Sequence, residues 1–266
     1  MTSERDAKGR HSAVLAPVIA LVVLCLAFFP VRAFNVSLFL MLNGFHSSCS
    51  DIVWLGFTTL GDGYLLAIIL GAFLVVNPRV TCLGLCLLVL SSLAMHAIKF
   101  SFPMMRPAGV LEAVHVVGPL LKSGAFPSGH TVASFSTGLA LAYFCSSRAA
   151  AGGVLGLAML ISLSRIFVGA HFPLDVLGGM ICSLALYVLL MLLVWPRLEP
   201  RLPEHPVLSA RPFRVALYVE VLAAVVALLV YAPLFAELPA VAAAVAAAIL
   251  AFLWTRYRTE KAAGRV

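Results

Sequence analysis

The stretch PLDVLGGMICSLALYVLLMLLVW, residues 173–195, carries one acid near its start, Asp175, and no other charged side chain. An α-helix needs about 20 mostly apolar residues to cross the hydrocarbon of a bilayer, and this run is long enough. Its apolar residues are continuous, whereas a strand of a membrane barrel would alternate apolar and polar positions. The stretch therefore predicts a transmembrane helix over residues 174–195.

The rest of the chain repeats this pattern. Of its 266 residues 62% are hydrophobic and 11% are charged, and the mean hydropathy is +1.07, values that exclude a soluble globular domain. We expect further membrane-spanning helices near residues 13–29, 53–76, 81–99, 129–147, 151–168, 214–232 and 238–255. The expected fold class is all-α, a polytopic membrane helix bundle of eight helices.

A segment rich in proline and charged residues separates two parts of the expected bundle. The segment WPRLEPRLPEHPVLSARPFR, residues 195–214, is rich in both, which is typical of a linker outside the membrane. We expect an N-terminal transmembrane anchor and outer interfacial segment over residues 1–52, a core over 53–195, a cytoplasmic linker over 196–213 and a C-terminal appendage of two transmembrane helices over 214–266. The anchor and the core together supply six helices. Residues 34–45 have apolar side chains at helical spacing, so they form either a short interfacial helix or a packed loop.

The basic residues indicate an orientation in the membrane rather than a nucleic-acid partner. The chain has 18 Lys and Arg against 11 Asp and Glu, a net charge of +7. With the N-terminus in the cytoplasm, both termini are cytoplasmic and most basic residues fall on that side, as the positive-inside rule requires. These are Arg5, Lys8, Arg10, Arg79, Arg148, Arg197, Arg201, Arg211, Arg214, Arg256, Arg258, Lys261 and Arg265. The outer side keeps Arg32, Lys99, Arg106, Lys122 and Arg165.

Three polar segments fall at the outer ends of the expected helices. The first is Lys99 with Arg106 and Pro107, the second is PSGH at residues 127–130, and the third is SRIFVGAHFPLD at residues 164–175. Two arginines and a lysine at one membrane depth would repel one another unless an anion binds between them, and arginine suits the oxygens of a phosphate. The pattern predicts a phosphate site at the outer face.

Local helix rules place the remaining polar groups of these segments. Ser128 is a favourable N-cap, and the N–H groups that follow it, beginning with Gly129, lack helical partners and attract anions. Gly169 suits the C-terminal cap of one helix and Pro173 the first turn of the next. His171 would then lie on the corner between the helices, where Asp175 can hold one ring nitrogen and leave the other free.

Together the three segments resemble the signature of the type 2 phosphatidic acid phosphatase superfamily, K-x6-R-P, P-S-G-H and S-R-x5-H-x3-D. Every signature position is matched in order, and the resemblance covers roughly residues 53–195, which would be the phosphatase catalytic core. The resemblance implies that His171 is the nucleophile, that Asp175 orients it, and that His130 is the general acid and base. It implies that the phosphate is bound by Lys99, Arg106, Ser128, Gly129 and Arg165.

The resemblance also implies a function. The expected reaction is hydrolysis of a phosphomonoester or diphosphate on a membrane lipid, through a phosphohistidine intermediate, without metal or cofactor. An outer site suits undecaprenyl diphosphate, which we favour, or phosphatidylglycerol phosphate, phosphatidic acid or lipid A phosphates, at the periplasmic face of a bacterial cytoplasmic membrane. Its expected partners are the lipid substrate and the bilayer; no nucleic acid is expected, and the sequence does not indicate a protein partner. A lipid phosphotransferase with the same intermediate, and a non-catalytic transporter or scaffold, are the alternatives.

Other polar residues outside the signature have simpler interpretations. We interpret His46, His96 and His115 as packing or buried polar groups, and Lys122 as a loop charge, with contact to the lipid headgroup as the alternative. Residues 61–63, GDG, read as a turn or a helix break, with Asp62 as a candidate for the outer mouth of the site.

Overall fold

Helices form nearly all of the regular structure in a computed structural model that describes residues 2–203 and residue 254. The α-helices are α1 (Thr2–Ala33), α2 (Asn35–Asn43), α3 (Ser48–Leu60), α4 (Gly63–Ala72), α5 (Pro78–Ser101), α6 (Pro107–Val110), α7 (Gly129–Phe144), α8 (Arg148–Phe167), α9 (Pro173–Leu193) and α10 (Trp195–Leu198). Two 3₁₀ turns, η1 (Phe73–Val75) and η2 (Glu199–Arg201), complete the described elements. The expected all-α class is confirmed. The expected helices at 214–232 and 238–255 lie outside the described residues, apart from Trp254.

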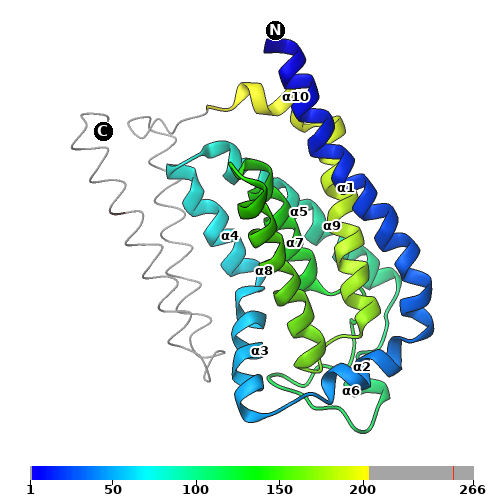
Figure 1. Ribbon diagram of the computed structural model, residues 1–266. Coiled ribbons are helices and arrows are strands. Elements are labelled where there is room, and N and C mark those ends of the chain that lie inside the picture. The colour runs from blue at the N-terminus through cyan, green and yellow to red at the C-terminus, as the bar shows by residue number, and fades with distance from the viewer. Residues whose placement is uncertain (1, 204–253, 255–266) are drawn as a thin grey trace.

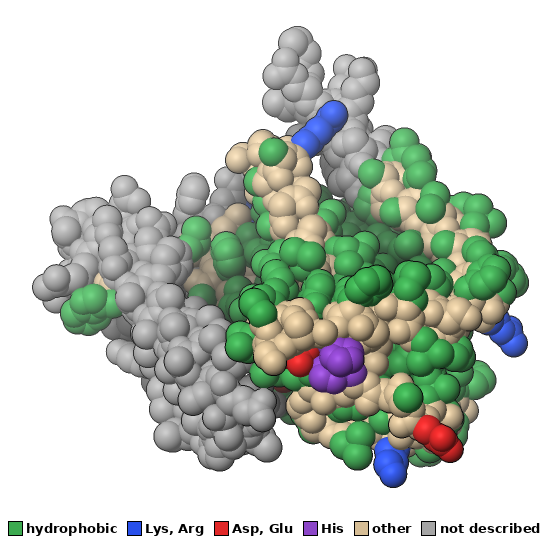
Figure 2. Space-filling view, turned by 60° about the horizontal axis from the view of Figure 1, so that its bottom comes forward, with side chains coloured by type: hydrophobic (Ala, Val, Ile, Leu, Met, Phe, Trp, Pro, Cys, Tyr) green, Lys and Arg blue, Asp and Glu red, His purple; other side chains and the backbone are tan. Residues whose placement is uncertain are grey.

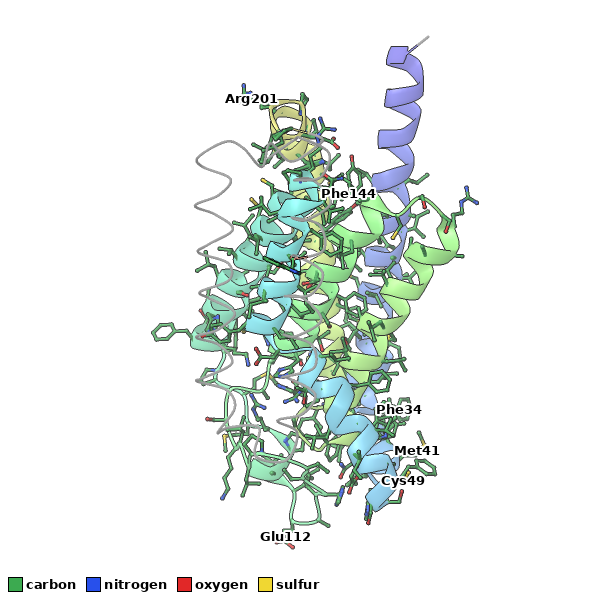
Figure 3. All side chains as sticks on the ribbon, turned by 90° about the vertical axis from the view of Figure 1, so that its left-hand side faces the viewer. Phe34, Met41, Cys49, Glu112, Phe144 and Arg201 are labelled. Atoms are coloured by element: carbon green, nitrogen blue, oxygen red, sulfur yellow. The ribbon has the colours of Figure 1, made fainter. Side chains whose placement is uncertain are left out.

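The long helices run alternately up and down through the bundle (Figure 1). α1 descends, the pair α3–α4 ascends, α5 descends, α7 ascends, α8 descends and α9 ascends. The start of α1 and the short α10 therefore lie at one end, whereas α2, α6 and the loop between α5 and α7 lie at the other (Figure 1). Figure 3 shows the same polarity, with Cys49 and Glu112 at the α2 end and Phe144 and Arg201 at the α10 end.

Four helices, α1, α5, α8 and α9, are long and apolar enough to cross a bilayer, and the bent pair α3–α4 makes a fifth span when taken together. Large apolar side chains cover their outward faces; examples are Leu15, Val22, Leu26 and Phe29 on α1, Leu93 on α5 and Leu192 on α9. Such surfaces are stable against lipid and costly in water. The chain is an integral membrane protein.

The expected span over residues 53–76 forms as a bent pair of helices, and the chain breaks at Gly61 and Asp62, within the GDG segment that indicated a turn or a helix break. α3 and α4 meet there at a bend of 58°. The Asp62 carboxylate caps α4 by accepting the backbone N–H of Tyr64 at 2.9 Å. Gly61 packs so closely against Ile161 that a side chain at this position would collide with it. The break thus turns the end of α3 into the bundle.

α7 occupies the centre of the bundle and packs against α4, α5, α8 and α9. It is shorter than the expected span over 129–147, because it ends at Phe144 and Ser147 already caps α8. Every residue from Thr131 to Ala140 is buried, and small hydroxyl side chains let the neighbours approach closely. Ser136, for example, donates to Ser91 of α5 at 2.9 Å. The first turn of α7 is therefore surrounded by helices on several sides.

The segment over residues 34–45 forms a helix, α2, and not a plain loop. Its Phe39 ring is fully buried and packs edge-on against Phe172, with ring centres 5.2 Å apart. Asn35 accepts the backbone N–H of Leu174 at 2.9 Å. α2 therefore supports the first turn of α9 at the α6 end of the molecule.

Candidate active site

The three signature segments meet at one end of the bundle, as expected. Lys99 lies in the last turn of α5, Arg106 immediately precedes α6, and Ser128 immediately precedes α7. Arg165 lies in the last turn of α8, and the α8–α9 corner carries His171. Residues as far apart along the chain as Lys99 and His171 thus converge near the end that holds α2 and α6.

Gly169 makes the sharp corner between α8 and α9. It follows the helix cap with a φ of +74°, a conformation that residues with a side chain rarely adopt. A side chain on Gly169 would also collide with the backbone oxygen of His115. The backbone N–H groups of Ala170 and His171 both donate to the carbonyl of Arg165 at 3.0 Å, which holds the corner closed.

His171 and Asp175 form a buried pair, with 1% and 2% of their surfaces exposed. His171 Nδ1 lies 3.3 Å from Asp175 Oδ2, and the same oxygen accepts the backbone N–H of Phe172 at 2.9 Å. The carboxylate is therefore held by the first turn of α9 and holds the imidazole in turn. Because Asp175 engages Nδ1, Nε2 is the nitrogen left for chemistry.

Ser128 precedes α7 as expected, but its hydroxyl makes no capping bond. Its Oγ is buried and has no hydrogen-bond partner. The Ser128 backbone N–H donates to the Asp175 carbonyl at 3.0 Å, which ties the start of α7 to α9. A buried hydroxyl without a partner is costly, and the first N–H groups of a helix attract anions. The start of α7 thus has the donors of an anion site.

The three cations are held mainly by neutral oxygens. Lys99 Nζ donates to the carbonyl of Gly124 at 2.7 Å, and Arg106 Nε donates to that of Ser123 at 2.9 Å. Arg165 donates from a terminal nitrogen to Thr58 Oγ1 at 2.7 Å, and its buried Nε has no partner. Among residues 2–203, no carboxylate forms a salt bridge with any of the three cations.

This arrangement determines the charge of His171. Burial lowers the pKa of His171 well below its usual value, and the positive charges of Arg106, Arg165 and Lys99 lower it further. Burial likewise lowers the pKa of Arg106, opposed by the charge of Asp175. His171 is therefore neutral at neutral pH, with a lone pair on Nε2 near three cations that form no salt bridge with a carboxylate of the described residues.

His130, the second residue of α7, is the remaining signature side chain in this region. It is half-buried, and its ring lies against Gly61 at the break between α3 and α4. Its charge acts on the pKa of His171, so the two histidines lie in the same electrostatic environment. A Cβ placed on Gly129 would lie at an ordinary van der Waals distance from the Met95 side chain. The positions of all eight expected site residues are thus compatible with one site.

Two positioning residues carried no recognisable sequence signal. Thr58 lies in α3 and accepts hydrogen bonds from Arg165 and, at 2.9 Å, from the Ser164 hydroxyl. Asn43 of α2 is 4% exposed; it donates to the carbonyls of His115 at 2.9 Å and Phe167 at 3.1 Å. Both sit in apolar segments, and their partners are far away in the sequence.

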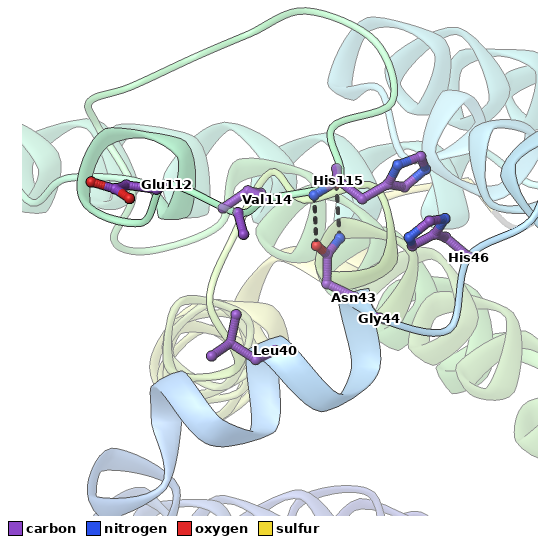
Figure 4. Close-up of a pocket in the computed structure, with 8 residues that line it drawn as sticks. Leu40, Asn43, Gly44, His46, Glu112, Val114 and His115 are labelled. Carbon is purple, nitrogen blue, oxygen red and sulfur yellow. Dashed lines mark hydrogen bonds between the residues drawn. The ribbon is translucent and has the colours of Figure 1, made fainter.

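The loop between α5 and α7 is fastened to the α8–α9 corner by this asparagine (Figure 4). The His115 N–H donates to Asn43 Oδ1 at 3.0 Å, and Val117 N–H donates to the Val168 carbonyl at 3.1 Å. The His115 ring stacks on His46, with centres 4.0 Å apart, and its Nε2 lies 3.0 Å from Asp51 Oδ2. In Figure 2, which turns this end forward, histidine lies beside an acidic side chain at the surface.

These contacts agree with a packing role for His46 and His115. A pocket of about 390 Å³ beside them is lined by Leu40, Glu112 and Val114 among others (Figure 4). His96 is exposed on α5 and contacts the Ser92 carbonyl of its own helix. Lys122 is exposed. Contact of Lys122 with a substrate stays a prediction.

Residues 79–199, which include all three signature segments, match the family model of the PAP2 superfamily. The undecaprenyl-diphosphatase of Sulfolobus acidocaldarius is 28% identical over 151 residues, which are 55% of this chain and 71% of that protein. YbjG of Escherichia coli (strain K12), whose name also contains undecaprenyl-diphosphatase, is 42% identical over 60 residues. That stretch spans 22% of this chain and 29% of YbjG. The crystal structure of LpxE from Aquifex aeolicus is similar with a TM-score of 0.56 and 28% identity, covering 59% of this chain and 93% of LpxE.

Proposed function

The chain belongs to the PAP2 superfamily, and from this we propose that it is a lipid phosphate phosphatase. The reaction is hydrolysis of a phosphomonoester or diphosphate on a membrane lipid. The buried His171–Asp175 pair beside three cations without a carboxylate partner is the observation that carries this proposal. Buried cations that lack a carboxylate partner are stabilised when an anion binds between them. The neutral imidazole of His171 is then placed to attack the phosphorus of the bound phosphate.

The first step forms a phosphohistidine. Nε2 of His171 attacks phosphorus, and the P–N bond forms while the bond from phosphorus to the leaving oxygen breaks. His130 donates its proton to that oxygen. The carboxylate of Asp175 stabilises the imidazole as it becomes positively charged, through the 3.3 Å contact with Nδ1.

The second step releases phosphate. Water attacks phosphorus, His130 takes the proton that the water loses, and the P–N bond breaks to restore neutral His171. In both steps charge develops on the phosphoryl oxygens. Lys99, Arg106 and Arg165, with the Ser128 hydroxyl and the Gly129 N–H, stabilise this charge. The buried Oγ of Ser128 and Nε of Arg165 are donors whose partner in this scheme is the phosphate.

We propose undecaprenyl diphosphate or a closely related lipid as the substrate, since the names of two similar proteins contain undecaprenyl-diphosphatase. The site would face the periplasm of a bacterial cytoplasmic membrane. This side is supported by the arginines near the opposite end, Arg148, Arg197 and Arg201, which the positive-inside rule places in the cytoplasm together with the N-terminus.

The test uses purified full-length protein with undecaprenyl diphosphate in detergent and EDTA. His171→Ala should abolish phosphate release, whereas His96→Ala, which removes an exposed histidine of α5, should not change it. Equal rates for His171→Ala and the unmodified protein would exclude the proposed chemistry. Phosphate release that requires a divalent cation would contradict its metal independence.

Two further measurements address the finer statements. With labelled substrate, label recovered in free phosphate supports hydrolysis, and label recovered in a second lipid would make the protein a phosphotransferase. A membrane-impermeant maleimide should label the exposed Cys49, at the end of the molecule that holds the site, from outside intact cells. Protection of Cys49 in cells would contradict the periplasmic orientation.

A further inference from the structure

An open apolar groove of about 310 Å³ lies between α1, α5 and α9. None of the lining residues is charged. They are Phe28, Ala94, Ile98, Phe126, Gly178, Ile181, Cys182, Ala185 and Leu186. Along α9 the lining runs from Gly178 to Leu186, a rise of about 12 Å along the helix. The groove thus extends over roughly two turns of membrane-spanning helix.

Small side chains create the space. Ala94 on α5 and Gly178 and Ala185 on α9 occupy positions where larger residues would fill the gap between the helices. The Phe126 ring packs so closely against Gly178 that any side chain there would collide with it. Phe126 therefore rests against α9 and forms one wall of the groove.

Three lining residues lie within three positions of a signature residue along the chain. Ile98 directly precedes Lys99 on α5, and Phe126 lies two residues before Ser128. On α9, Gly178 follows Asp175 by three residues, a spacing that puts both on nearly the same face of a helix. One end of the groove therefore adjoins the phosphate site, and the other end lies deeper along α5 and α9.

We propose that this groove binds the hydrocarbon chain of the lipid whose phosphate reacts at His171, an inference that rests on the proposed function. A lipid phosphate is charged at one end and apolar along the rest of its length. The protein matches this arrangement: the site offers cations and the N-terminus of α7 to the phosphate, and the adjoining groove is apolar. The groove lies on helices that cross the bilayer, so the hydrocarbon chain of the lipid can enter it without leaving the apolar interior of the membrane.

The physical effect of the groove is orientation. Moving a chain from lipid into an apolar groove yields little hydrophobic free energy, because lipid tails are as apolar as the groove. Tight packing of the first part of the chain restricts how the headgroup sits against Nε2 of His171, and such positioning increases the rate of the chemical step. Blocking the groove should therefore reduce kcat/KM for long lipids and leave short substrates unaffected.

The experiment compares two alanine-to-phenylalanine variants on the same helix. Ala94 lines the groove, and Ala97, three residues further along α5, is exposed outside it. Ala94→Phe should lower kcat/KM for undecaprenyl diphosphate about tenfold. It should not change kcat/KM for isopentenyl diphosphate, whose five carbons carry the same headgroup. Ala97→Phe should change neither value.

If Ala94→Phe lowered kcat/KM equally for the long and the short substrate, the substitution would be damaging the phosphate site. If kcat/KM of the variant equalled that of the unmodified protein on both substrates, the groove would not hold the hydrocarbon chain. Either result overturns the inference. Ala185→Phe, from the opposite wall, should reproduce the chain-length dependence.

A direct binding measurement separates this inference from the proposed function. A long-chain lipid diphosphate with a diazirine on its chain should label the peptide that contains Cys182, and unlabelled undecaprenyl diphosphate should suppress the labelling. Labelling that responds only to excess bulk phospholipid would assign the groove to ordinary membrane lipid and refute the inference. If the unmodified protein hydrolyses neither diphosphate, the proposed function fails, whereas the labelling still reports on the groove.

Discussion

Asparagine in place of Asp175 should slow the reaction about tenfold, and alanine should slow it about a hundredfold or more. The difference follows from one geometric detail. Both donors, His171 Nδ1 at 3.3 Å and the Phe172 N–H at 2.9 Å, meet the same carboxylate oxygen. An amide oxygen at that point accepts both bonds, and the opposite amide orientation would direct an NH₂ group against a backbone N–H. Asparagine therefore keeps the geometry and loses the charge.

The magnitude follows from the change in bond strength. A hydrogen bond to a charged partner contributes about 1.5–3 kcal/mol and a neutral one about 0.5–1.5 kcal/mol. The difference, about 1.4 kcal/mol on the bond to an imidazole that becomes cationic, corresponds to about tenfold in rate. Alanine removes the bond entirely, about 3 kcal/mol or about a hundredfold, and also frees the imidazole to rotate. It further leaves the buried Phe172 N–H without a partner, which costs about 1–3 kcal/mol of folding free energy.

Initial rates of phosphate release and thermal unfolding in the same detergent measure both effects. Asp175→Asn should unfold within a few degrees of the unmodified protein, and Asp175→Ala should unfold at a lower temperature. If asparagine slows the reaction as much as alanine, the single shared oxygen is not what orients His171. If alanine retains more than a third of the rate, Asp175 does not orient it at all.

Two further perturbations test the support and the charge of the site. Asn43→Ala should lower the free energy of unfolding by about 2–4 kcal/mol, because it removes buried hydrogen bonds to both backbone groups of His115 and one further carbonyl. Asn77→Ala, which removes one N-cap bond from α5, should lower it by about 1 kcal/mol in the same denaturation assay, and equal losses would contradict the assigned role. Because burial and nearby cations lower the pKa of His171, the rate should fall with acid only below about pH 6.5, as protonation removes the nucleophile. Arg106→Gln should move this fall in kcat/KM to higher pH, since one charge that lowers the pKa of His171 is gone; a shift to lower pH would refute the electrostatic account.

Much of the fold could be predicted because its signals are local. Continuous apolar runs predicted α1, α5, α8 and α9 to within a few residues, apart from the N-terminal turns of α1 that extend beyond the apolar run. The glycine and proline around the α8–α9 corner predicted its shape correctly. The break between α3 and α4 is different. The sequence shows a glycine and an aspartate, but it does not show that Ile161 packs against Gly61.

Some features of the candidate site could likewise be predicted from the sequence, and others could not. The signature positions could be named from the sequence, and the structure brings Lys99, Ser128 and His171 to one end of the bundle. The absence of a hydrogen-bond partner for the buried Ser128 hydroxyl was not predictable, because an N-cap serine ordinarily accepts a backbone N–H of its own helix. Thr58 was not predictable either, because its partner Arg165 is 107 residues away.

The sequence by itself determined the membrane class, the helical architecture, the corner that carries His171 and the ionisable groups of the site. Hydropathy, capping and backbone conformation act over one or two helical turns, so the residues concerned are neighbours in the chain. Only the tertiary structure decided which oxygens hold the three cations, which donors remain without partners, and where an apolar groove adjoins the charged site. These are contacts between helices that pack side by side, and no local preference specifies which side chains will meet there.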